Sequence, residues 1–271
     1  MQKLIIDANK KSLSLNLKEL YAYKDLFFTL SYRDLRVRYA QTFLGLLWAF
    51  LQPLATLIIF SLVFGRFVKV DTGTIPYPLF ALTGMVVWTY FSFVMSNAGS
   101  SIIDAQQMVK KIYFPRLIIP LSKAVVGFVD FVIALLFLTL LMMWYGFAPS
   151  WNIIYLPVFI LLTIIAALAT GIWLSALTIR YRDFKHIVPF MVQFGLYATP
   201  IAYPTSLIDS RYQALFYANP LTGIIDGLRW SVLGGEAPHL YSFISIGIML
   251  LLFVAGVFYF KKAEKIIADI V

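Results

Sequence analysis

The 271-residue sequence contains no cysteine, two histidines and few charged residues, and each shortage excludes a class of protein. Without cysteine there is no disulfide framework, no thiolate metal site and no cysteine nucleophile. His186 and His239 are too few and too far apart for a histidine-based zinc site. Charged residues make up 13% of the chain, against roughly a quarter in a soluble domain. Because so few charges cannot cover a globule of this size, a water-soluble enzyme is excluded.

Motifs for catalysis and nucleotide binding are also missing. None of the fifteen glycines is followed by lysine, so the chain has no GxxxxGK[ST] phosphate-binding loop. GxSxG, HExxH and paired loop carboxylates are absent as well. We therefore expect no catalytic residue, cofactor or metal ion on this chain. Uphill transport would draw its energy from an ion gradient or from another subunit.

Long apolar runs dominate the sequence. Hydrophobic residues make up 61% and aromatic residues 17% of the chain, and the mean hydropathy is +0.84. A helix needs about 20 apolar residues to cross the ~30 Å hydrocarbon core. These runs predict an all-α polytopic membrane protein with one transmembrane domain over residues 1–271. We expect an arm over 1–41 and six spans near 42–64, 77–99, 117–143, 152–179, 187–203 and 240–260.

The net charge of +9 could suggest nucleic acid, but its distribution favours a membrane protein. Eighteen of the 22 Lys and Arg residues fall in the arm and in segments 110–123, 180–185 and 261–265, between or beyond the apolar runs. This positive-inside pattern predicts that both termini are cytoplasmic and that the number of spans is even. We expect no nucleic-acid partner.

Residues 212–233 are apolar enough to suggest a seventh span, which would place the last lysines outside. The segment is interrupted by Asn219-Pro220 and carries Asp226 and Arg229. An outer re-entrant helical hairpin between spans five and six therefore fits better, because irregular backbone at membrane depth needs cover from protein or water.

Two cytoplasmic segments are predicted to be helical without spanning. In the arm, apolar residues share one face of an amphipathic interface helix that lies on membrane lipids: Leu17, Leu20, Tyr21, Phe27, Phe28, Tyr32, Leu35 and Tyr39. This helix is either a simple anchor or a cradle for a cytoplasmic partner. Residues 100–116 predict a short helix with Ser100 or Ser101 as its cap and with Pro115 ending it. Its charges suit the helix dipole, with Asp104 in the first turn and Lys110 and Lys111 in the last turn. It is either a docking helix or a plain linker.

Asp130 lies inside the third predicted span. A charge at membrane depth is costly, so it should face protein or water. A hydrogen bond to a neighbouring helix and a role in a proton relay are both open. Lys123 lies on the same face, ~10 Å along the helix axis, and we expect it to snorkel to the cytoplasmic surface rather than pair with Asp130.

Aromatic side chains mark two predicted spans. Phe190, Phe194 and Tyr197 lie at i, i+4 and i+7 in span five, hence on one face. In span one, Phe43 and Phe50 are seven residues apart and Trp48 lies on a flank. Flat aromatic faces can hold the C–H side of a sugar ring without fixed hydrogen bonds, so these six residues are candidates for a translocation path. Packing against lipid or other helices is the alternative.

Four strings together resemble one family: YRDLRVRYAQTFLGLLWAFLQPL (32–54), KIYFPRLIIPL (111–121), IRYRDFKHIVPF (179–190) and ANPLTGIIDGLRW (218–230). They resemble permease subunits of type-2 ABC exporters, in the branch that exports polysaccharide, O-antigen and teichoic acid. The resemblance implies a homodimer of six-span subunits in the bacterial cytoplasmic membrane. It also implies two separate ATPase subunits that bind ATP and Mg²⁺, a lipid-linked glycan substrate and a path near spans one and five.

The same resemblance implies that the arm, the helix after span two (a cytoplasmic coupling helix) and the RYRD loop contact the ATPase. We expect this contact to involve Asp104, Gln107, Lys110, Lys111, Arg182 and Asp183. Three other functions stay open: a drug or small-lipid exporter of the same superfamily, a membrane-embedded lipid-using transferase, and a passive channel. A transferase needs converging acidic or histidine residues, which we do not find, and a channel needs no docking helix.

Overall fold

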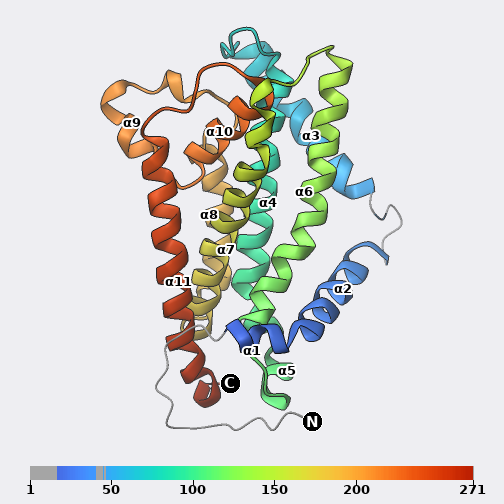
Figure 1. Cartoon of the computed structure of the whole chain (residues 1–271), viewed down its shortest axis with the longest axis vertical. Coiled ribbons are helices and arrows are strands. Elements are labelled where there is room, and N and C mark those ends of the chain that lie inside the picture. The colour runs from blue at the N-terminus through green and yellow to red at the C-terminus, as the bar shows by residue number, and fades with distance from the viewer. Residues whose placement is uncertain (1–16, 41–44, 46, 271) are drawn as a thin grey trace.

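The computed structural model describes residues 17–40, 45 and 47–270, and within these residues all regular structure is helical (Figure 1). Long helices run side by side along the vertical axis of the figure, and short helices cover both ends of the bundle. The all-α prediction is confirmed for this part of the chain.

Five helical segments of the described part are long and apolar enough to cross a membrane. Three of them are α4 (Tyr77–Asp104), α6 (Ile118–Trp144) and Ser242–Glu264 within α11 (Ser242–Ile270). The segment Leu47–Phe67 consists of α3 (Leu47–Phe60) and the π-helix η1 (Ser61–Phe67). The segment Trp151–Arg180 consists of the 3₁₀ helix η2 (Trp151–Tyr155) and α7 (Leu156–Arg180). Each coincides with a predicted span to within a few residues. Uninterrupted apolar length was therefore a sufficient guide to these five helices.

The helix at the fifth predicted span, 187–203, starts and ends a few residues earlier than predicted and is slightly shorter. α8 (Phe184–Ala198) has 15 residues, or about 22 Å at 1.5 Å per residue, which is less than the ~30 Å hydrocarbon core. It ends because Thr199 has extended backbone angles, as expected of a residue that precedes a proline. The short 3₁₀ helix η3 (Thr205–Leu207) follows.

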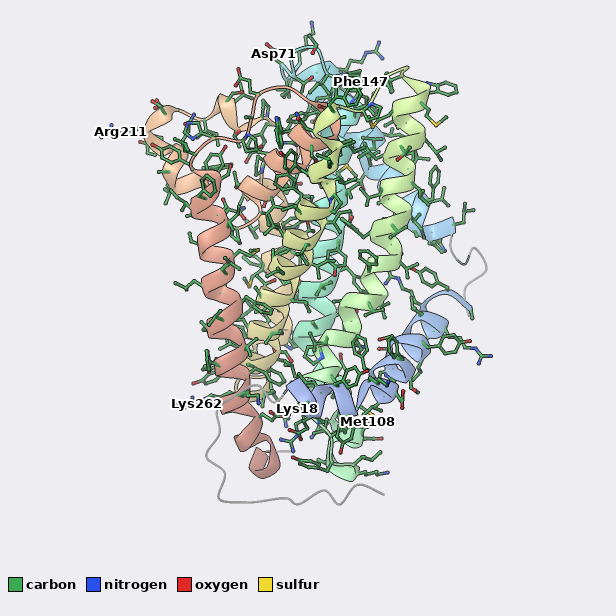
Figure 2. All side chains as sticks on the ribbon, in the orientation of Figure 1. Lys18, Asp71, Met108, Phe147, Arg211 and Lys262 are labelled. Atoms are coloured by element: carbon green, nitrogen blue, oxygen red, sulfur yellow. The ribbon has the colours of Figure 1, made fainter. Side chains whose placement is uncertain are left out.

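The arm and the last helix meet at the same end of the bundle. Figure 2 shows Lys18, Met108 and Lys262 at one end, and Asp71, Phe147 and Arg211 at the other. Lys185, near the start of α8, forms an ion pair with Asp104 at the end of α4. Asp104 is close in sequence to Met108, so Lys185 lies near the same end of the bundle as Met108. Arg211 lies at the opposite end, so the chain runs the length of the bundle between Lys185 and Arg211, although α8 is short.

The centre of the bundle is α4, which packs on α6 and α7, while α11 packs on the other side of α7. Most residues of α4 are buried. Small residues bring α4 and α7 close together: a Cβ added to Gly171 would lie 2.9 Å from the Cβ of Ala98. Close backbone approach of this kind is typical of packed membrane helices. In contrast, α3 and α8 lie at the edge and bury few residues.

The interrupted segment forms two helices, α9 (Ser210–Phe216) and α10 (Thr222–Leu233), separated at Asn219-Pro220. The Asn219 amide donates to the Thr199 hydroxyl at 2.9 Å, and its carbonyl oxygen accepts from the Leu221 N–H at 3.0 Å. α10 is almost entirely buried against α4, α7 and α11. At 12 residues it is about 18 Å long, too short to cross the membrane.

In the part of the arm that the structure describes there are two helices, α1 (Leu17–Ala22) and α2 (Lys24–Ala40), and α2 packs on α6. Leu30 is buried, and Leu20 and Phe27 pack around the same cluster, which joins the arm to α4, α5, α6, α7 and α11. The predicted apolar face is divided: Leu20 and Phe27 pack against the bundle, whereas Tyr21, Phe28 and Tyr32 are exposed. Helical periodicity located the apolar stripe, but only the tertiary structure shows which of its residues pack and which stay exposed.

Candidate functional site

A pocket of about 460 Å³ lies at membrane depth between α3, α4, α6 and α8, with the end of α2 at one side. Its lining is unusually polar for a bundle of apolar helices. The polar side chains come from α2, α3, α4 and α6: Arg38, Tyr39, Gln52, Thr89, Ser92, Ser96, Asn97 and Asp130. Polar groups facing one cavity between membrane helices are typical of a solute path, because exposure of such groups to hydrocarbon is costly.

Asp130 is the centre of the charged part of this pocket. Its Oδ2 accepts a hydrogen bond from Arg38 Nη2 at 2.6 Å, and its Oδ1 accepts one from the Tyr39 hydroxyl. The Arg38 guanidinium also lies 4.4 Å from the centre of the Phe93 ring, in the range of a cation–π contact. Asp130 is thus hydrogen-bonded to a neighbouring helix, the first of the two predicted alternatives.

A second ion pair ties α2 to α6 closer to the end of the bundle. Lys123 Nζ lies 2.6 Å from Asp34 Oδ2, and Arg33 contacts the other carboxylate oxygen at 2.8 Å. Partial burial raises the pKa of Asp34, but the hydrogen bonds from Lys123 and Arg33 outweigh burial, so this pKa lies below its usual value. Lys123 therefore pairs with the arm instead of snorkelling freely; as expected, it does not pair with Asp130.

The predicted path residues are divided between several surroundings. Trp48 lines the pocket, whereas Phe50 packs against Phe137 of α6 with ring centres 4.5 Å apart. Phe43 lies outside the described residues.

On α8, Phe190, Phe194 and Tyr197 form an exposed stripe, with the first two rings 4.2 Å apart. They do not line the pocket; the α8 residue that does is Val192. The stripe is thus free to face lipid, a second subunit or a solute outside this pocket.

The six predicted docking residues are all exposed and lie in two adjoining segments. The ion pair between Asp104 and Lys185, 3.1 Å long, joins the end of α4 to the start of α8. The short helix α5 (Gln106–Lys111) carries Gln107, Lys110 and Lys111 on the surface, while Val109 anchors it in the core. The remaining two, Arg182 and Asp183, lie in the turn between α7 and α8.

The predicted cap of the docking helix is wrong. Ser100 and Ser101 lie inside α4, which continues to Asp104, and the residue before α5 is Ala105. The Ser100 hydroxyl donates to the Asp104 carboxylate at 2.7 Å instead. The apolar residues of α4 continue to pack past the predicted end, so the helix does not stop at the serines.

Sequence reasoning missed the polar face of α4. Thr89, Ser92, Ser96 and Asn97 lie at i, i+3, i+7 and i+8, hence on one face of the helix. That spacing could have predicted the polar face from the sequence. The pairing of Arg38 with Asp130 could not have been predicted, because 92 residues separate them.

Comparison with known proteins agrees with this architecture. The family model described as ABC-2 type transporter matches residues 25–233. The chain is 30% identical to the O-antigen export system permease protein RfbA of Myxococcus xanthus over 91% of this chain and 96% of the relative. It is 30% identical to the RfbA permease of Klebsiella pneumoniae, over 91% and 95%, and 23% identical to the polysialic acid transport protein KpsM of Escherichia coli, over 88% and 93%. With most of its length matched by the family model, this chain belongs to the ABC-2 type transporter family.

Proposed function

We propose that this chain is the permease subunit of an ABC exporter that moves a lipid-linked polysaccharide of the O-antigen, capsule or teichoic acid type. The observation that carries the proposal is the similarity to O-antigen export permeases along nine-tenths of the chain. The polar pocket supports it, because a hydrophilic polymer needs polar surroundings at membrane depth.

The energy for export comes from a separate ATPase. The sequence has no phosphate-binding loop, and the exposed surface formed by α5 and the turn before α8 is suited to contact a second protein. Lys110 and Lys111 give this surface positive charge, which would attract an acidic face on the partner. ATP and Mg²⁺ would be bound by that partner.

The complete exporter would contain two copies of this chain and two ATPase subunits in the bacterial cytoplasmic membrane. Edge helices α3 and α8 expose apolar side chains, including Trp48 and Phe194, and are available for contact with a second copy. If α8 and the segment after it carry the chain across the membrane between Lys185 and Arg211, the chain crosses the membrane six times and both of its ends are cytoplasmic. The arm would lie in the membrane interface with Tyr21, Phe28 and Tyr32 toward lipid.

The function is tested by deleting the gene and returning it on a plasmid, alone and with its ATPase. We expect surface polysaccharide to disappear on deletion and to return with the intact chain. ATP should be hydrolysed when the purified permease is reconstituted with the ATPase, and should not be hydrolysed by the permease alone. Unchanged surface polysaccharide in the deletion strain would reject the function; a drug or small-lipid substrate would instead appear as altered efflux in the same strain.

The exposed stripe on α8 is the part of the path to test first. Replacing Phe190, Phe194 and Tyr197 singly by Ala should reduce surface glycan at normal permease abundance, if the rings contact the polymer. Phe258→Ala, also an exposed ring but on α11, is the matched control. If export falls only in proportion to abundance, the three rings are packing residues and do not line the path.

A further inference from the structure

A second pocket, of about 550 Å³, lies at the other end of the bundle. It is formed by the loop before α4, the segments before and within α9 and α10, and the loop after α10, and it shares no lining residue with the pocket at membrane depth. Asp71 marks this end in Figure 2. The polar and aromatic side chains of its lining include Asp71, Gln213, Asp226, Arg229, Trp230 and Glu236. Its volume is in the range of sites for small organic ligands.

Arg229 is buried in this pocket and lacks one hydrogen-bond acceptor. Its Nη2 donates to the Ile201 carbonyl at 2.8 Å and its Nε to the Phe80 carbonyl at 3.4 Å. Its Nη1 has no hydrogen-bond partner. A buried donor left without an acceptor is costly, and such groups are few in native structures.

The ion pair of Nη1 with Asp226 is too long for a hydrogen bond. Asp226 Oδ1 lies 3.8 Å away, beyond hydrogen-bond distance. The two hydroxyls that bind Asp226, from Thr205 and Tyr217, both donate to Oδ2, at 3.1 and 2.8 Å. A donor without a hydrogen bond and a carboxylate oxygen thus lie side by side. A hydroxyl about 2.8 Å from each would accept from Nη1 and donate to Oδ1. An alcohol group fits this pair, since it can do both at once.

The rest of the lining favours a ligand with several hydroxyls. Asp71 and Glu236 add exposed carboxylates at the rim, and Gln213 adds an amide. Trp230 adds an aromatic ring, which lies 5.3 Å from the ring of Tyr155, and such a ring can contact the C–H face of a sugar. Three carboxylates against the single charge of Arg229 make the pocket acidic, which disfavours phosphate and acidic sugars.

We propose that this pocket binds a short uncharged segment of glycan on the outer face of the permease. The proposal rests on the proposed function, because export is what delivers glycan to this face. It adds a binding site outside the membrane-depth path, with a preference for neutral over acidic sugars.

The absence of native cysteine permits a direct test. Ser206 lines the pocket and is exposed, so the full-length Ser206→Cys variant in nanodiscs should react with an impermeant maleimide. Short neutral oligosaccharides, released from the surface polysaccharide of the source cell, should slow this reaction several-fold at millimolar concentration. Ser210→Cys, exposed on α9 and outside the pocket lining, is the control whose rate should not change.

Two further variants identify the groups involved. Glu236→Gln and Asp71→Asn lie at the exposed rim, where the fold should tolerate them, and each should weaken protection of the cysteine at 206. Protection by inorganic phosphate instead of neutral sugar would overturn the proposal and indicate an anion site. Absence of protection by any oligosaccharide would also overturn it. If oligosaccharides give no protection but the deletion strain still loses its surface glycan, the proposal for this pocket is rejected and the proposed function is not.

Discussion

The ion pair between Arg38 and Asp130 should be a principal attachment of α2 to the membrane helices. We expect Arg38→Gln and Asp130→Asn each to destabilise the protein, and their double variant to lose less than the sum of the two. Each single variant leaves one charge in the polar pocket without its partner, whereas the double variant leaves none. The Asp34–Lys123 pair remains intact in all three and limits the change to the end of α2.

The size of the effect follows from burial. The side chains of Arg38 and Asp130 are 38% and 20% exposed, so the pair lies between two limits. An exposed ion pair contributes up to about 1 kcal/mol, and breaking a buried pair costs about 3–5 kcal/mol. We therefore expect each single variant to lose about 2 kcal/mol and the double variant to lose about the same, so that the coupling free energy is also about 2 kcal/mol. At about 2–4 °C per kcal/mol, each single variant should melt about 4–8 °C lower.

The assay is thermal unfolding of the purified permease in detergent, followed by its soluble monodisperse fraction, for the wild type and the three variants. Arg36→Gln, which removes an exposed cation from the same helix, is the control and should leave the melting temperature unchanged. Strictly additive single effects, giving a coupling free energy near zero, would refute the reasoning. The pair would then be a geometric contact that does not stabilise the arm.

Three further predictions concern topology, docking and pH. A cysteine at Trp151 should react with an impermeant thiol reagent on intact cells, and one at Asp183 only after permeabilisation; the reverse result would invert the proposed orientation. Lys110→Glu with Lys111→Glu should release the ATPase in a pull-down while the permease stays in the membrane, and normal assembly would remove the docking proposal. Because the folded-state pKa of Asp34 lies below its ordinary value of 3.8, its contribution to stability is complete above that value and is lost as the pH falls through the lower folded pKa. The protection factor of the α2 amides, which corrects the exchange rate for its intrinsic pH dependence, should therefore be steady from neutral pH to about 5 and fall under stronger acid, and Asp34→Asn should remove this dependence.

The positions of the long helices were predictable because crossing a membrane depends on local composition. A run of about 20 apolar residues is stable as a helix in hydrocarbon whatever its neighbours are. For this reason five predicted spans match the structure, and the break at Asn219-Pro220 does too. The clusters of Lys and Arg also placed the arm and the last helix at the same end of the molecule, as Figure 2 shows.

Contacts between segments that are far apart in the sequence were decided only by the tertiary structure. Periodicity located the apolar stripe of the arm but could not show that the face carrying Leu30 and Asp34 would pack on α6. The partner of Asp130 comes from α2, 92 residues away in sequence, and no local sequence pattern predicts a contact between residues so far apart. The second pocket likewise depends on the 3.8 Å gap between Arg229 and Asp226, which the packing of α10 against its neighbours sets. Hydropathy is a property of each segment alone, whereas a site exists only where several segments come together.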